Sequence, residues 1–454
     1  MGTLSESRGY GRGAVKNIPD ASAEVLVPAP PRTAGWQLRI AFYAVYVALL
    51  MMAPTIVSSP ARYFGVSSDT ALYWTWLAIN GFAVLLVLAA ARQRPAALLT
   101  VILFSGYILA SSMWSVAPQT SLQYGSTLVG VLCVAYLMSV DMGMRGILVL
   151  LARVTVTLSV VGLLLYVMRA DIAIYVDAAN RANLLGTLPF KGLFPHKIVA
   201  GFYAATGIVA IMATSRPGAG KVLSVLCLLA VIVLSSSSTA LVLLPFAIAI
   251  YLLTRRALER GMRARAWIAS LIITAIVGGL LMAWTWSDVL GLLSRDTTLT
   301  GRTTLWDWGL RTWAERPIFG WGYGAYFETP EAAAVAYSIP EFRSWDVPHF
   351  HQTYIQTAVD FGVVGLVALV VVIFKVLLRS YKHGAALGSS VAAGTFAIAL
   401  TAAAAGFVMY LVPSYAYTEV VPLFLFATLF STGAIEKARR RASPAGARDQ
   451  RRVR

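Results

Sequence analysis

Residues 348–365, PHFHQTYIQTAVDFGVVG, close a stretch that begins at Trp286 and includes GRTTLWDWGLRTWAERPIFGWGYGAYF at 301–327. In a chain that is only 13% charged, this stretch gathers two histidines, several acids and six of the twelve tryptophans. It also carries five arginines: Arg295, Arg302, Arg311, Arg316 and Arg343. The long apolar segments on both sides of it offer few reactive groups. We therefore expect chemistry or recognition to take place in this stretch.

The composition of the whole chain indicates a membrane protein. Of its 454 residues, 58% are hydrophobic, whereas soluble domains average about 45–50%. Apolar runs of roughly 18 or more residues recur along the chain, which predicts an all-α, polytopic helical membrane protein. A soluble protein is excluded because too little polar surface is present to cover so large a core. Cys133 and Cys227 both lie in apolar runs, so we interpret them as small hydrophobes without disulfide or metal-ligand spacing.

The apolar segments predict about twelve transmembrane helices. The first six are expected near residues 38–57, 72–91, 96–113, 122–140, 146–168 and 194–214. The second six are expected near residues 222–234, 240–254, 266–284, 354–377, 389–412 and 419–433. The seventh and eighth are short and share the polar joint 235–239, SSSST. A large loop, 285–353, separates the ninth span from the tenth.

The basic residues predict how the chain is oriented. Arginine and lysine concentrate in alternate connections, such as 255–265, and in the tail, which is typical of the cytoplasmic side. Residues 1–35 then form a disordered cytoplasmic leader, 36–434 the transmembrane domain, and 435–454 a basic cytoplasmic tail. The 285–353 loop faces outward. The net charge of +17 would suit nucleic acid, but its distribution fits membrane orientation and contact with lipids, so we expect no nucleic-acid partner.

A first outward group of polar residues leads into the sixth span. It contains Arg181, Lys191, His196 and Lys197. A helix N-terminus flanked by cations suits the oxygens of a phosphate, so we interpret these residues as binding substrate. The alternative is structural: the lysines extend to the membrane interface while His196 caps the helix.

A second outward group, His349 and His351, precedes the tenth span. Histidine has an ordinary pKa of about 6.5, which suits a general base. Residues at i and i+2 do not share a helix face, so we expect the two rings to point in different directions. The string Gly320-Trp-Gly322-Tyr-Gly324 has no strand before it, which indicates a tight aromatic turn and not a nucleotide site.

Several of these segments resemble the O-antigen ligase-like family of bacterial polysaccharide ligases and polymerases, with the exopolysaccharide-polymerase branch the closest. The matching elements are Gly301-Arg302 with Trp306, residues 315–322 (ERPIFGWG), residues 349–354 (HFHQTY), residues 360–365 (DFGVVG) and residues 190–197 (FKGLFPHK). The family usually has Asn where this chain has Gln352 and Ile198. Its Ser-Arg/Lys-Thr element is Ser237-Ser238-Thr239 here, so a cation expected to hold donor phosphate is missing.

The resemblance implies a glycosyltransferase that needs neither metal nor cofactor and acts on undecaprenyl-diphosphate-linked sugars. The family's catalytic histidine corresponds to His351, and the arginine of its Gly-Arg element corresponds to Arg302. The substrate-binding set then comprises Arg181, Lys191, His196, Lys197, His349, Trp306 and Tyr354. Among these, Lys191, Lys197 and Arg181 are candidates to replace the missing cation. Such a reaction needs a base for the hydroxyl proton and cations for the departing diphosphate.

Three functions are compatible with these features. A polymerase would join lipid-linked repeat units in the bacterial cytoplasmic membrane, together with other polysaccharide export proteins. A ligase would pass a finished glycan to a lipid or protein acceptor. A transporter of lipid-linked sugars is disfavoured, because paired halves are absent from the sequence and Arg153 and Asp360 are the only obvious candidates for charged residues buried within the membrane.

Overall fold

The helices follow the apolar segments of the sequence. The computed structural model describes residues 35–63, 67–90, 93–176, 183, 185–273, 302–339, 347–412 and 419–442. The first half contains α1 (Trp36–Tyr63), α2 (Ser68–Ala90), α3 (Pro95–Ala110), α4 (Pro118–Asp141), α5 (Met144–Val167), α6 (Lys197–Thr214), α7 (Ala219–Ser235) and α8 (Ser238–Glu259). A further helix covers Ala264–Ile273. The second half contains α11 (Arg302–Glu315), α12 (Pro330–Ser338), α13 (Thr353–Lys382), α14 (Gly384–Leu387), α15 (Ser389–Ala405) and α16 (Val421–Ala442).

The predicted fold class, a polytopic helical membrane protein, is confirmed. Within the described residues, eight helices are long and apolar enough to cross a membrane: α1 to α6, α8 and α13. Four shorter apolar helices, namely α7, Ala264–Ile273, α15 and the apolar part of α16, coincide with the remaining expected spans. The ninth expected span is described only as far as Ile273, and its remainder lies outside the described residues. Strand pairing in the described chain is limited to a bridge between Ile174 and Phe190.

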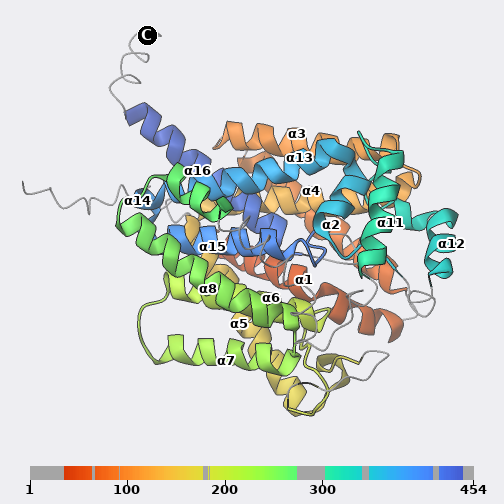
Figure 1. Ribbon diagram of the computed structural model, residues 1–454, viewed down its shortest axis with the longest axis horizontal. Helices are drawn as coiled ribbons and strands as arrows, with labels where there is room; N and C mark the ends of the chain where they lie inside the picture. Colours follow the sequence, from red (N-terminus) through yellow and green to blue (C-terminus); the bar gives the residue numbers. More distant parts are fainter. Residues whose placement is uncertain are drawn as a thin grey trace, which may run out of the picture.

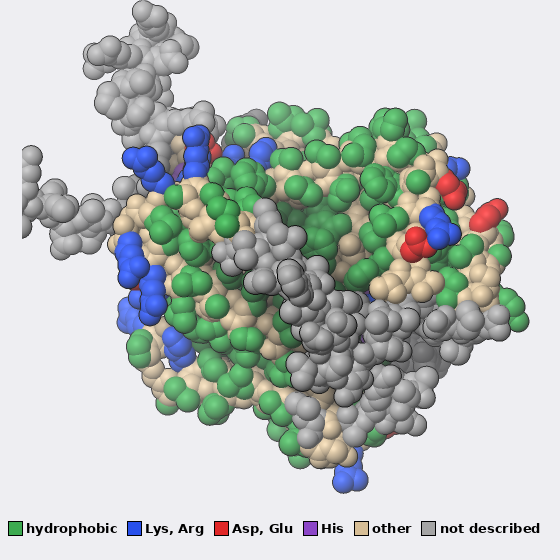
Figure 2. Space-filling view, in the orientation of Figure 1, with side chains coloured by type: hydrophobic (Ala, Val, Ile, Leu, Met, Phe, Trp, Pro, Cys, Tyr) green, Lys and Arg blue, Asp and Glu red, His purple; other side chains and the backbone are tan. Residues whose placement is uncertain are grey.

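The bundle has two chemically different ends. Its helices run side by side, with α11 and α12 at one end (Figure 1). Lysine and arginine side chains gather at the opposite end, where α8 and α13 finish (Figure 2). Hydrogen bonds join connections that the sequence assigns to the same side: Arg145 Nη2 donates to the Thr214 carbonyl (3.0 Å), and Trp114 Nε1 donates to the Phe319 carbonyl (3.0 Å). The leader and most of the tail lie outside the described residues.

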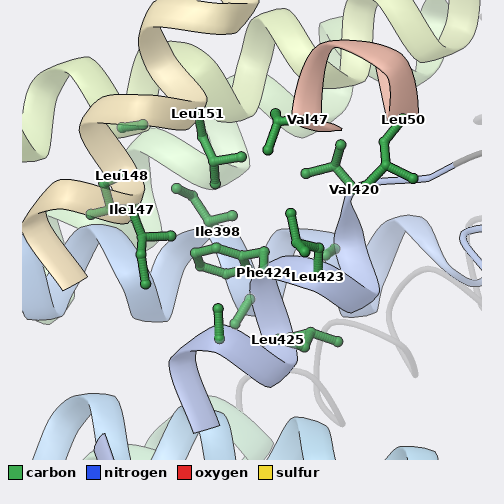
Figure 3. Close-up of a cluster of buried hydrophobic side chains, with 14 of the residues drawn as sticks. Val47, Leu50, Ile147, Leu148, Leu151, Ile398, Val420, Leu423, Phe424 and Leu425 are labelled. Atoms are coloured by element: carbon green, nitrogen blue, oxygen red, sulfur yellow. The ribbon is translucent and has the colours of Figure 1, made fainter. Parts of the chain in front are cut away.

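The core is formed by helices far apart in the sequence. Val47 and Leu50 of α1 meet Leu151 of α5, Ile398 of α15 and Phe424 of α16 (Figure 3). Because lipid is as apolar as these side chains, close packing and not the hydrophobic effect stabilises such contacts. Small residues permit the closest approaches.

One such approach brings α15 against α6. A Cβ added to Gly394 would lie 2.4 Å from the Ala213 Cβ. A larger residue at position 394 would therefore force these two helices apart.

The polar joint between the seventh and eighth spans is a tight turn. Ser236 has φ 47° in the left-handed region, and Ser237 begins α8 as its N-cap, accepting a hydrogen bond from the Ala240 amide (3.2 Å). Ser237 is buried, and Gly201 of α6 lies directly beneath it. The joint therefore serves as a packed helix connection, in a place where the family usually carries a cation.

Candidate active site

Arg302 begins α11, which lies against the start of α13 (Figure 1). Its Nη1 donates to the Val408 carbonyl at 3.2 Å, which holds the guanidinium beside the segment that follows α15. Trp306 is one turn further along α11 and shares its face. Gly309 allows the close approach of the two helices, because a Cβ there would lie 2.5 Å from Ile355 Cγ2. The structure thus places Arg302 next to the histidine segment.

The two histidines form a tight, non-helical turn. His351 has φ 52°, in the left-handed region that few residues with a side chain adopt. Its amide donates to His349 Nδ1 at 3.1 Å, and the ring centroids are 4.2 Å apart. The prediction that the rings point in different directions was wrong, because a left-handed turn brings i and i+2 side chains together. Such strain is often kept at functional sites.

Both histidines are held neutral. Burial, together with the charge of Arg302 and the nearby His196, lowers the pKa of His351 to about 3. Burial and the neighbouring His351 lower the pKa of His349 well below its usual range. His349 also uses Nδ1 as an acceptor, which only a neutral ring can do. A neutral imidazole has a lone pair for a proton, as a general base requires.

The loop before α6 reaches the same place. His196 lies near enough to His349 and His351 to lower the pKa of each. It caps α6, with Nδ1 accepting from the Ile198 amide (3.1 Å) and Nε2 hydrogen-bonded to the Tyr175 hydroxyl (2.8 Å). His196 therefore caps α6, as the structural alternative expects, and its charge also acts on the histidine turn. The loop before α6 therefore lies within electrostatic range of the histidine turn.

The two lysines of this loop differ in their surroundings. Lys197 Nζ lies 4.9 Å from the centre of the Tyr175 ring, a cation–π contact that fixes its position. Lys191 is half-buried, and burial lowers its pKa. Arg181 lies outside the described residues. Both described candidates for the missing cation are thus positioned by the same loop as His196.

Tyr354 is directed away from the histidine turn. Its hydroxyl donates to the Ala403 carbonyl of α15 at 2.7 Å, and its ring packs on Phe407 with centroids 4.6 Å apart. It also lines an apolar cavity of about 120 Å³ inside the bundle. In the structure Tyr354 therefore joins α13 to α15.

The aromatic residues of the 302–339 segment mostly form a small core. Trp308 Nε1 donates to the Tyr326 hydroxyl (2.8 Å), and Trp308 also packs edge-on against Phe350. Trp306 packs against this core, and its buried Nε1 has no hydrogen-bond partner among the described residues. The cluster fixes the loop beside the histidines, and Trp306 is left with a donor for a further group.

Residues 315–322 and residues 360–365, two of the family-like elements without an assigned role, pair with each other at a break in α13. Gly362 has φ 66° and interrupts the helix. The loop 315–322 supplies the hydrogen bonds lost there: Val363 N donates to the Pro317 carbonyl (2.8 Å) and Trp321 N donates to the Val359 carbonyl (2.8 Å). Backbone freed within a membrane helix needs such partners. These elements therefore dock the loop onto α13.

Asp360 was not a candidate site residue, and the structure connects it to the histidine turn. Its Oδ1 accepts from the Gly324 amide and from Gln356 Nε2, each at 3.1 Å. Gln356 Oε1 in turn accepts from the amide of Phe350, between the two histidines (2.9 Å). The departure at Gln352 is tolerated because its Oε1 caps α13, accepting from Ile355 N (2.6 Å).

Tyr410 and Glu419 are two further residues that the sequence did not single out. The Tyr410 ring packs on the His349 ring, with centroids 4.9 Å apart. The Tyr410 hydroxyl is hydrogen-bonded to the Tyr323 hydroxyl. Glu419 is buried and accepts from the Tyr203 hydroxyl (2.5 Å). Among the described residues, no three His, Cys, Asp or Glu side chains are grouped to hold a metal ion.

The chain is similar in sequence to known proteins. Residues 223–370 match the model of a family described as O-antigen ligase; the match includes Arg302, His349 and His351. Over 361 residues the chain is 27% identical to the exopolysaccharide production protein ExoQ of Rhizobium meliloti (strain 1021), covering 75% of this chain and 77% of that relative. The chain is a multi-pass membrane protein, and it is similar to the O-antigen ligase family over residues 223–370 and to a protein of exopolysaccharide production over most of its length.

Proposed function

We propose that the chain polymerises undecaprenyl-diphosphate-linked oligosaccharide repeat units into an exopolysaccharide or O-antigen-like polymer, as a metal-independent glycosyltransferase. The observation that carries the proposal is the meeting of Arg302, a neutral pair of histidines and the cationic loop before α6 at one end of a membrane bundle. The relative's role in exopolysaccharide production favours polymerisation over transfer to another acceptor.

The chemistry requires one proton acceptor and a site for a leaving anion. The acceptor hydroxyl oxygen attacks the anomeric carbon of the donor sugar, and the bond from that carbon to the diphosphate oxygen breaks. His351 takes the hydroxyl proton, and Arg302 stabilises the departing diphosphate. The anion offsets the positive field of Arg302, so substrate binding raises the pKa of His351 and makes it a stronger base.

The remaining assignments concern binding. Lys191 and Lys197, with Arg181, are proposed to complete the diphosphate site that lacks the family's usual cation at Ser238. His196 and His349 orient the site, since each holds a loop or turn through its ring nitrogen. Trp306 is proposed to face sugar, because its buried donor has no partner among the described residues. Tyr354 is proposed to act indirectly, by holding the start of α13.

The length of the lipid-linked glycan after deletion of the gene tests the function. A polymerase predicts that single repeat units accumulate on the lipid. A ligase predicts long chains that are never transferred to an acceptor, and this result would replace our proposal. Re-expression of the full chain should restore long polymer.

The proposal also requires that the 302–351 segment face outward from the cytoplasmic membrane. The charge asymmetry of the two ends supports this orientation. Tyr337 is 72% exposed on α12, so a cysteine there should react with an impermeant thiol reagent in intact cells. Reaction only after the cells are lysed would reverse the topology.

A further inference from the structure

A cavity with both polar and apolar walls lies far along α13 from the histidine turn. Its volume is about 930 Å³, and it lies between α3, α13 and α16. Three cationic side chains line it: Arg94, Lys375 and Arg379. This is the end of the bundle at which lysines and arginines gather (Figure 2). None of these residues takes part in the proposed reaction.

The cations are placed by the α16 backbone. Arg94 Nη1 donates to the Phe430 carbonyl (3.3 Å), and Arg379 Nη1 donates to the carbonyl of the preceding residue, Leu429 (3.4 Å). Arg379 Nη2 also lies 3.4 Å from Glu436 Oε2. Lys375 is exposed one turn before Arg379 and on the same face of α13. Three positive charges thus line the cavity, and the partly exposed Glu436 carboxylate offsets only one of them.

An apolar wall continues from these cations into the bundle. On α13 it consists of Val364, Val367, Ala368, Val371 and Val372, and on α3 it includes Phe104. The α13 residues recur at helical spacing and form one stripe that ends at Lys375. From Val364 to Lys375 the helix rises about 16 Å, close to half of the roughly 30 Å hydrocarbon thickness of a bilayer. The wall therefore has the length of one leaflet.

We propose that this cavity binds an anionic phospholipid of the leaflet at the basic end of the bundle, with its phosphate between Arg94, Lys375 and Arg379. One acyl chain lies along the stripe from Val364 to Val372. A soluble anion would use the cations and leave the apolar wall empty. A zwitterionic lipid would bring its own positive charge to a site that already has an excess. The assignment does not depend on the proposed enzymatic function.

Competitive binding to the purified full chain tests the proposal. The probe is spin-labelled phosphatidylglycerol, compared with phosphatidylcholine that carries the same acyl chains. Phosphatidylglycerol should bind several-fold more tightly, and Lys375→Gln should weaken it by about fivefold, as removal of one basic residue near a lipid surface does. Lys382→Gln, on the same helix but outside the cavity lining, should leave binding unchanged.

A second pair of variants tests the apolar wall without changing charge. Val367→Trp should fill the cavity along the apolar wall and weaken the binding of phosphatidylglycerol by at least about fivefold. Val370→Trp, equally membrane-exposed but not part of the lining, should have no effect. Equal binding of the two lipids, or full displacement by inorganic phosphate at constant ionic strength, would overturn the proposal. So would equal effects of the two tryptophans.

Discussion

The two ends of α13 carry polar residues that are held in contrasting ways. At the start, Gln352, Gln356 and Asp360 are buried, and their side chains hydrogen-bond directly to main-chain amides or to one another. At the other end, Lys375 and Lys382 are exposed, and Arg379 makes one long contact to a carboxylate. The break at Gly362 separates these two regions.

The difference shows which features of the chain require specific residues. At the histidine end, each hydrogen bond has one geometry, and an unmatched buried partner costs about 1–3 kcal/mol. At the basic end, the exposed charges are screened by salt and contribute little to folding. Substitutions should therefore have large effects on folding and activity at the first end, and small effects on folding and activity at the second.

Gly362→Ala should have the largest effect of all. A Cβ at this position would lie 2.0 Å from the Ile318 carbonyl oxygen, and the backbone is in the left-handed region. The strain alone costs about 1–3 kcal/mol, and the clash is with backbone that cannot move without undocking loop 315–322. We expect little monodisperse protein after detergent extraction. Gly106→Ala, where nothing lies within 4 Å, is the control and should behave as wild type; normal yields of both variants would refute the docking role.

Arg302→Ala should lower polymer formation by about 10²–10³, as loss of one charge-stabilising donor does. Arg302→Lys should recover little, because a point charge does not replace a planar fork. Initial rates with lipid-linked repeat units measure both. Arg311→Ala on the same helix is the control, since its ion pair with Asp307 is exposed and contributes little. Wild-type rates in Arg302→Ala would remove Arg302 from the site.

Asp360 should act as a hydrogen-bond acceptor. A single oxygen, Oδ1, accepts from both the Gly324 amide and Gln356 Nε2. Asp360→Asn keeps that oxygen, so kcat should stay within about threefold of wild type. Asp360→Ala leaves two buried donors unmatched and should lower kcat by about tenfold or more, with KM less affected. If Asn were as damaging as Ala, the negative charge and not the geometry would be the essential property.

The pH profile should show the smallest effect. Because the pKa of His351 is lowered to about 3 in the free protein, its neutral form persists as the pH falls through the usual histidine range. The acid limb of kcat/KM should therefore lie below about pH 5 instead of near 6.5. In Arg302→Gln, the acid limb of the residual activity should lie closer to pH 6.5, because the Arg302 charge no longer lowers the pKa of His351. A wild-type limb near 6.5 would contradict this environment for His351.

Sequence reasoning located the helices better than it predicted the geometry of the candidate site. Apolar runs are long and local, so each of the twelve expected spans overlaps an apolar helix. The left-handed turn at His351 was not predicted, because histidine is only a weak signal for positive φ. The pairing of 315–322 with the break at Gly362 joins segments some forty residues apart, which no local pattern reveals. Glu419 was likewise absorbed into the start of an apolar run, although the fold buries it beside Tyr203.

The central claim is that His351, and not His349, accepts the proton from the attacking hydroxyl. The most direct test measures polymer formed from lipid-linked repeat units by purified His351→Ala and His349→Ala at equal folded protein. Loss of a general base costs about 10²–10⁴ in rate, whereas His349 mainly holds the turn through its Nδ1. We predict that His351→Ala forms no detectable polymer while His349→Ala retains measurable activity. An active His351→Ala protein would contradict the account.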